Sequence, residues 1–271
     1  MKTRTELKML AKEAMRLQRK TAILIMLVMT LKALFLVVFN DLFARSLSSF
    51  PLFAINLLIV LALIILMVNV MREYLKIYRR EHTHVMALYP DFFTHMGHNL
   101  SGMMWMVLWG FIWALISIPV IILAIYLVRS GGASMKTLAI ILVGPVHLIT
   151  LIPAIIKSIS YSMTPFILSD YPGVHTREAL KLSMRMMGGH KKELFKFTLS
   201  FFGWFVLSIL TLGVLYVVYV GPYYHIALAG FYEEVRAKTV IADDDIIVET
   251  ETDILQDDDD LVIETAELEA E

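Results

Sequence analysis

The 271-residue chain contains no cysteine. Disulfide frameworks, thiolate nucleophiles and cysteine-ligated zinc or iron–sulfur centres are therefore excluded. The sequence also lacks the Walker A loop of nucleotide-binding proteins, the Gly-x-Gly-x-x-Gly fingerprint, the Gly-x-Ser-x-Gly elbow of serine hydrolases and the His-Glu-x-x-His pattern of zinc proteases. With no motif for catalysis or cofactor binding, we expect neither enzymatic activity nor a bound cofactor.

Basic residues are missing from residues 243–271, which hold 14 Asp and Glu. Residues 1–242 hold 24 Lys and Arg against 11 Asp and Glu, so the overall net charge of −1 conceals a region of +13. We predict that residues 239–271 form an acidic tail that is disordered when free. Its apolar area is too small to offset an ordering cost of roughly 1–2 kcal/mol per residue.

Apolar residues make up 58% of the chain, and its mean hydropathy is +0.69. Soluble domains contain about 45–50% apolar residues, so the composition indicates an all-α membrane protein. Apolar segments long enough to cross about 30 Å of hydrocarbon predict six spans within a helical membrane domain at residues 21–238. The predicted spans lie near residues 21–42, 52–71, 100–128, 137–156, 194–210 and 214–232, with the last two forming a hairpin divided at residues 211–213.

The distribution of Lys and Arg predicts the orientation of these spans. With both termini on the cytoplasmic side, the cytoplasmic segments hold 20 Lys and Arg and the external loops hold 3. Cytoplasmic loops of membrane proteins carry this excess of positive charge. The first apolar run is also too long for a cleavable signal peptide. We therefore expect a multi-pass protein of the bacterial cytoplasmic membrane.

Three segments on the predicted cytoplasmic side carry basic residues at helical spacing. Residues 1–20 are expected to form a basic amphipathic helix, and the segment after the second span repeats the pattern. A third helix is predicted over residues 176–187. The stripe residues after the second span and in the third helix are Arg72, Lys76, Arg79, Arg80, Arg177, Lys181 and Arg185. Such helices favour an anionic lipid surface, at about 1 kcal/mol per basic residue; alternatively, they serve only to orient the spans.

Several motifs in the second half of the chain resemble one bacterial family. They are Ser160-Tyr161-Ser162-Met163-Thr164-Pro165-Phe166-Ile167-Leu168-Ser169-Asp170, Ala179-Leu180-Lys181-Leu182-Ser183, Met187-Gly188-Gly189-His190-Lys191, Leu199-Ser200-Phe201, Gly203-Trp204, Leu210-Thr211-Leu212-Gly213, Pro222-Tyr223 and Phe231-Tyr232-Glu233. Over about 75 residues the chain is similar to the membrane proteins grouped as DUF975. The resemblance implies an integral membrane protein of a Gram-positive type of cell and brings no known activity. The acidic tail looks like an addition to the family's core.

Few polar residues interrupt the predicted spans. Lys32 lies near the middle of the first span and His147 in the fourth, and ionisable residues inside hydrocarbon are functional candidates. A snorkelling lysine is the alternative. Helix breaks are expected in the fourth and sixth spans, at Gly144, Pro145, Pro153, Gly221 and Pro222. Broken helices can expose carbonyls to a substrate cavity, although proline also kinks membrane helices without a transport role.

Four histidines, His82, His84, His95 and His98, cluster with Asp91 between the second and third spans. Their spacing fits no named metal motif, so we interpret them as loop histidines and predict no metal site.

Two hypotheses about the function of the protein remain, and they belong to different functional classes. The first is a non-enzymatic scaffold or envelope-homeostasis factor that engages anionic phospholipid headgroups or partner proteins at the cytoplasmic face. A protein partner could bind the tail, where β-branched clusters suit a strand added to a sheet edge and the run Asp257 to Asp260 suits basic surfaces. The alternative is a transporter of a small solute or lipid, in which Lys32 and the breaks of the fourth and sixth spans line one cavity. No nucleic-acid partner is expected, because basic stripes beside membrane spans meet lipid first.

Overall fold

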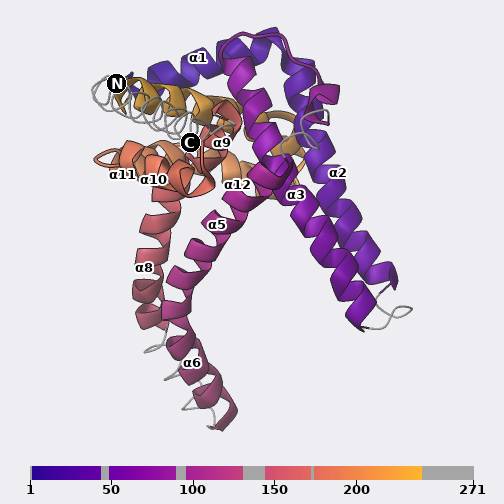
Figure 1. Ribbon diagram of the computed structural model, residues 1–271, viewed down its shortest axis with the longest axis vertical. Coiled ribbons are helices and arrows are strands. Elements are labelled where there is room, and N and C mark those ends of the chain that lie inside the picture. Colours follow the sequence, from indigo (N-terminus) through magenta and orange to yellow (C-terminus); the bar gives the residue numbers. More distant parts are fainter. Residues whose placement is uncertain (1, 44–48, 90–95, 131–143, 172–173, 240–271) are drawn as a thin grey trace, which may run out of the picture.

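The computed structural model describes residues 2–43, 49–89, 96–130, 144–171 and 174–239. Every element in these ranges is a helix. Two groups of apolar helices diverge from a compact group of shorter helices, which we call the cap (Figure 1). Within the described residues, five helical segments are long and apolar enough to cross a membrane: Arg19–Asn40, Pro51–Tyr78, Gly97–Leu127, Pro145–Asp170 and Lys191–Leu210. The structure thus confirms an all-helical chain with several potential membrane-spanning helices.

The first diverging group, the first leg, pairs α2 (Arg19–Phe43) with α3 (Ser49–Tyr78). Both helices are apolar around most of their circumference, as expected for helices in hydrocarbon. The side-chain amides of Asn40 and Asn56 exchange hydrogen bonds across the pair. Polar pairs of this kind contribute roughly 0.6 kcal/mol each between membrane helices, so they fix the register of the leg near its tip.

The second leg contains α5 (Met96–Ala114), the 3-10 turn η2 (Leu115–Ser117) and α6 (Ile118–Ser130), which follow one another without a break. These elements pack beside α8 (Gly144–Tyr161). The predicted third span at residues 100–128 falls within the first three elements. The fourth, at residues 137–156, overlaps α8, and its first seven residues lie outside the described ranges.

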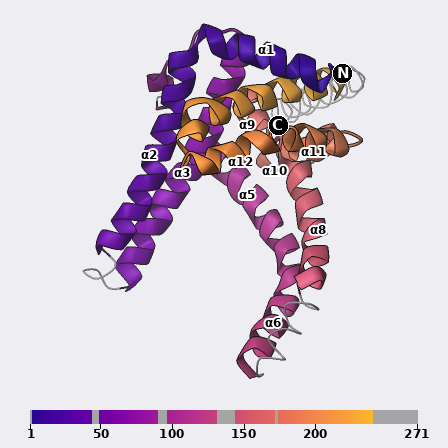
Figure 2. The same cartoon turned by 180° about the vertical axis from the view of Figure 1, so that it is seen from behind.

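The cap gathers α1 (Arg4–Leu17), α9 (Thr164–Asp170), α10 (Thr176–Met186), α11 (Lys191–Leu199) and the helix over residues 221–239, which we call the last helix. A capping box of Thr3 and Glu6 begins α1, satisfying backbone donors that the first turn leaves open. The predicted helix over residues 176–187 is confirmed to within one residue as α10, and it begins after His175 without a side-chain cap. Both views show α1 and the last helix lying together on top of the cap (Figure 2).

Aromatic side chains form the centre of the cap. Phe166 of α9 stacks on Tyr232 of the last helix, with ring centroids 5.2 Å apart. Phe197 of α11 and the neighbouring Phe201 are fully buried against the same helix. Fully burying a large apolar side chain contributes about 1.5–3 kcal/mol, so the last helix is the element around which the cap is organised.

Glycine allows two close approaches of the last helix to the first leg. A Cβ added to Gly230 would lie 2.5 Å from the Tyr78 ring of α3, and one added to Gly221 would lie 2.8 Å from Cε of Met26 in α2. A side chain at either position would force neighbouring atoms to shift in a closely packed interior. Glycine therefore lets the last helix pack against both helices of the leg without such a shift.

The chain turns at the residues where the predicted hairpin divides the last apolar stretch. After α12 (Phe202–Leu210), Leu212 and Gly213 adopt positive φ angles of 51° and 83°. A π-helical segment, η4 (Tyr216–Val220), then leads into the last helix. Both views show α12 lying across the cap rather than along a leg (Figures 1 and 2). The predicted sixth span, at residues 214–232, is not among the five segments long and apolar enough to cross.

The number of crossings and the orientation stay predictions, and single cysteines test them. Cysteine at Ser49 or Ser134 should react with an impermeant thiol reagent added to intact cells, whereas cysteine at Thr265 should not. The six-span topology also requires labelling at Leu212, whose side chain is 94% exposed at the hairpin turn. Protection of Leu212 alone would reduce the count to four, and labelling at Thr265 would overturn the hairpin.

Candidate functional site

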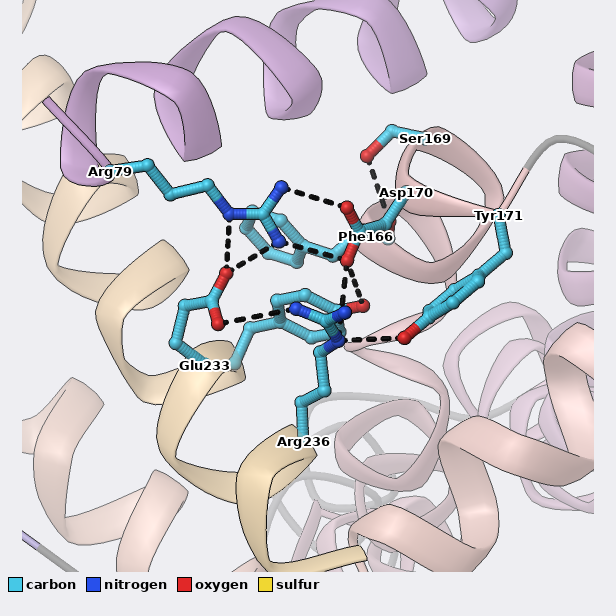
Figure 3. Close-up of polar contacts among 8 residues, drawn as sticks. Arg79, Phe166, Ser169, Asp170, Tyr171, Glu233 and Arg236 are labelled. Carbon is cyan, nitrogen blue, oxygen red and sulfur yellow. Dashed lines mark hydrogen bonds and ion pairs between the residues drawn. The ribbon is translucent and has the colours of Figure 1, made fainter. Parts of the chain in front are cut away.

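Three elements distant in sequence meet at a charged cluster in the cap (Figure 3). Arg79 follows the end of α3, Asp170 is the last residue of α9, and Glu233 lies on the last helix. The Arg79 guanidinium donates from Nη1 and Nη2 to the two carboxylate oxygens of Asp170, at 2.8 and 2.9 Å. Its Nε donates to Oε1 of Glu233 at 2.7 Å. Bidentate pairs of this kind are among the stronger hydrogen-bonded contacts in proteins.

A second arginine completes the cluster from the other side. Nε of Arg236 donates to the Tyr171 hydroxyl at 2.7 Å and lies 3.5 Å from Oδ2 of Asp170. The Tyr232 hydroxyl donates to the same Asp170 oxygen at 3.1 Å. Two arginines thus face two carboxylates, and Figure 3 shows their side chains converging between the three elements. We call Arg79, Asp170, Glu233 and Arg236 the clamp.

The electrostatics of the clamp favour the charged forms of its two arginines. Burial alone would lower the pKa of Arg79, but the hydrogen bonds and charges of Asp170 and Glu233 outweigh burial and raise it. The pKa of Arg236 is raised in the same way, against burial, by Tyr171 and the charge of Asp170. The clamp therefore joins the end of α3, α9 and the last helix through charge-assisted hydrogen bonds.

A neighbouring polar network ties the loop after α3 to α1. The Gln18 side chain donates to the Glu81 carbonyl at 2.6 Å and accepts from the Thr83 backbone N–H at 3.0 Å. The Thr83 hydroxyl bonds to Glu73, a carboxylate fully buried on α3. Glu73 lies two residues beyond the predicted second span, in the part of α3 that continues to Tyr78.

The basic stripe after the second span is largely occupied by contacts within the protein. Besides Arg79 in the clamp, Lys76 pairs with Glu73 at 2.9 Å and Arg80 pairs with Glu13 of α1 at 3.1 Å. Arg72 also has a partner. Within the described part of the chain, this stripe holds the cap to the first leg, and its charge is largely balanced there.

The stripe on α10 has a different setting. Ala179, Leu180, Ser183 and Met186 are buried beneath α10, whereas Arg177, Lys181 and Arg185 are all exposed on its other side. The helix packs across the upper ends of α5 and α8. The Arg177 guanidinium lies over the Trp105 ring of α5, 4.7 Å from its centroid. This contact joins the stripe to α5 at the upper end of the second leg.

The intramembrane candidates and helix breaks lie apart. Lys32 borders a crevice of about 290 Å³ between α2 and α3, with its Nζ 4.7 Å from the centroid of the Tyr89 ring. His147 is in the first turn of α8, and no hydrogen-bond partner for its shielded Nδ1 exists among the described residues. The break residues are distributed over two helices: Gly144, Pro145 and Pro153 in α8, and Gly221 and Pro222 at the start of the last helix.

The crevice that Lys32 borders has no helix-break residue in its lining. The π-helical segment η4, which packs against α2, ends in a hydrogen bond from the Gly221 N–H to the Tyr216 carbonyl, and Pro222 follows directly. The crevice at Lys32 is therefore not lined by the helix breaks, contrary to what the transporter alternative requires.

The histidine cluster shows no metal geometry where it is described. His82 and His84 are exposed, while His95 and Asp91 lie outside the described residues. His98, at the start of α5, has a partner. Among the residues that the structure places, no three His, Asp or Glu side chains are close enough to hold one ion.

A comparison with family models gives one match. The family described as "Protein of unknown function (DUF975)" matches residues 1–239. The chain belongs to the DUF975 family. No curated protein and no solved structure matches it. The match covers both legs and the cap and ends where the acidic tail begins.

The DUF975 motifs supply both carboxylates of the clamp. Asp170 ends the first motif, and Tyr232 and Glu233 end the last. Sequence reasoning assigned Arg79 to a lipid stripe and missed its carboxylate partners, which lie 91 and 154 residues away. One signal could have found them: Asp170 and Glu233 are among only 11 acidic residues in residues 1–242, where 24 basic residues predominate.

Proposed function

We propose that this DUF975 protein is a non-enzymatic membrane scaffold, whose cap binds the anionic surface of the cytoplasmic leaflet and organises lipid or partner proteins there. The observation that supports it is the stripe of Arg177, Lys181 and Arg185. All three cations are exposed on one side of α10, at the junction of the cap and the second leg. Most of the α3 stripe pairs with carboxylates within the protein.

The charge asymmetry of the chain provides a way to regulate this lipid binding. Residues 1–242 carry +13, and residues 243–271 carry 14 acidic residues. We propose that the tail competes with anionic lipid for the basic residues of the cap, or recruits a protein partner when the cap is bound to lipid. The transporter alternative has less support, because the crevice that Lys32 borders has no helix-break residue in its lining.

Replacing Arg177, Lys181 and Arg185 together by Gln tests the surface interaction. At about 1 kcal/mol per basic residue near an anionic surface, we expect binding to anionic liposomes to weaken by up to about a hundredfold at low salt. The difference should shrink at high salt, since the screening length is about 8 Å at physiological ionic strength. Flotation of purified protein with liposomes of graded phosphatidylglycerol content measures it. Equal binding by the two proteins would leave the stripe only a role in orientation.

The same assay separates the tail from the stripe. A chain ending at Ala242 should insert and fold, and it should bind anionic liposomes more tightly than the full chain at low salt, because an intramolecular competitor has been removed. The matched control replaces Asp257 to Asp260 by Asn in the full-length chain. Identical affinities for truncated and full-length protein would exclude competition by the tail and leave partner recruitment.

A further inference from the structure

A groove on the second leg has an apolar wall and a positively charged rim. The proposed scaffold function does not require this groove. Its lower wall is a stripe of isoleucines on α8, and its upper rim is the polar side of α11. It encloses about 420 Å³. The lining side chains are Ile152, Ile155, Ile156, Ile159, Lys191, Lys192, Phe195 and Lys196.

The isoleucines follow the spacing of a single helix face, i, i+3, i+4 and i+7. From Ile152 to Ile159 they extend along α8 for about 10 Å, at 1.5 Å per residue. Ile152, Ile155 and Ile156 are each about half exposed. Phe195, at 53% exposure, continues the apolar surface up to the lysines. The stripe therefore offers a hydrocarbon surface that no other part of the described chain covers.

The rim provides three cations close together. Lys191, Lys192 and Lys196 share the groove, and none of them forms an ion pair within the described residues. The nearest carboxylate along the chain, Glu193, is engaged by Nδ1 of His190 at 2.9 Å. The lysine stems can lie along the apolar wall while the ammonium groups stay in the polar region. A concentrated positive charge thus lies at the upper end of an apolar stripe.

We propose that this groove binds one anionic phospholipid from the leaflet beside the cap, with its phosphate among Lys191, Lys192 and Lys196 and an acyl chain along the α8 isoleucines. Basic pockets of membrane helices on the cytoplasmic side bind anionic headgroups by these contacts. A free phosphate would use the lysines and leave the isoleucine stripe without a role. The crevice at Lys32 offers one cation rather than three. The proposal shares its lipid class with the proposed function, but it concerns one retained molecule at different residues.

Native mass spectrometry of the full-length protein in a mild detergent, titrated with dioleoyl phosphatidylglycerol, tests the site. The test variant replaces Lys191, Lys192 and Lys196 by Gln, and the matched control replaces Arg177, Lys181 and Arg185 by Gln, so each loses three positive charges. We expect the first bound lipid to be held about a hundredfold more weakly by the test variant. The control should retain it and lose only liposome binding.

Two further arms identify what is recognised. Glycerol 3-phosphate should bind at least tenfold more weakly than the phospholipid, and Ile155→Ser with Ile156→Ser should weaken only the phospholipid. Equal binding of glycerol 3-phosphate would show a simple anion site and overturn the proposal. Equal lipid loss in both charge variants would overturn it too, since nonspecific attraction would then explain retention. If the triple variant does not fold, Lys192→Gln against Lys192→Arg replaces it, and unchanged binding in both contradicts the site.

Discussion

Replacing Arg79 by Met is expected to lower the free energy of unfolding by about 2–4 kcal/mol. Removing one member of a buried ion cluster leaves the others without compensation, at a cost of roughly 3–5 kcal/mol when burial is complete. The side chain of Arg79 is 27% exposed and that of Asp170 is 11% exposed, so solvent screening reduces the effect. Thermal unfolding in detergent, followed by loss of the monodisperse elution peak, measures the change.

The neighbouring Arg80 provides the matched control. It pairs with Glu13 at 3.1 Å, but both side chains are more than half exposed. Exposed pairs contribute about 0–1 kcal/mol, so Arg80→Met should leave stability almost unchanged. In a double-mutant cycle, Arg79→Met and Asp170→Leu together should cost less than the sum of the single changes, because neither charge is then left alone. Equal effects at Arg79 and Arg80 would show that the clamp contributes no more than a surface pair.

Replacing Gly230 by Val is expected to destabilise the protein by about 1–3 kcal/mol, the usual cost of overpacking. Even a Cβ at this position would lie 2.5 Å from the Tyr78 ring. Either the last helix moves away from α3 or the ring leaves its half-buried place, and the clamp residue Arg79 follows Tyr78 directly. The same unfolding measurement reports the loss.

Gly203 of α12 provides a control, because a side chain added there should not lower stability. A Cβ added there meets nothing within 4 Å, so Gly203→Ala should be neutral or stabilise the helix by about 0.5–1 kcal/mol. Combining Gly230→Val with Tyr78→Ala should recover part of the loss, since the second change opens the space that the first one fills. Failure of this combination to recover any stability would show that the close approach at Gly230 is not what limits packing.

Local patterns predicted the helices well. The apolar runs located α2 and α3, and the four-residue spacing of Arg177, Lys181 and Arg185 located α10 to within one residue. The positive φ of Gly213 agrees with the turn expected there. These features depend on residues within one or two turns of each other, so hydropathy and spacing are enough to reveal them.

The clamp and the course of the last helix could not be predicted in this way. Arg79 looked like another member of a lipid stripe, because a cation at a membrane interface has the same pattern whether its partner is a phosphate or a carboxylate. Its partners come from α9 and the last helix, far along the chain. The crosswise course of α12 depends on packing against elements that no local period encodes. In the sequence, the lysines of α11 counted only as charges that set the orientation of the spans. The groove that they form with the isoleucine stripe is visible only when α8 and α11 are placed together.

The position of the last helix has a consequence for how the chain is assembled during synthesis. α1 is made first, yet it contacts the last helix, which is made after both legs: the Lys8 carbonyl accepts a hydrogen bond from the Tyr223 hydroxyl, and Lys2 pairs with Glu234 at 2.7 Å. Because a nascent chain emerges from its N-terminus, both legs are complete while α1 still lacks this support. Chains that stop before residue 221 would lack these contacts to α1. The cap is therefore the last part to close, and its closure marks a chain that has been synthesised to the end of its family core.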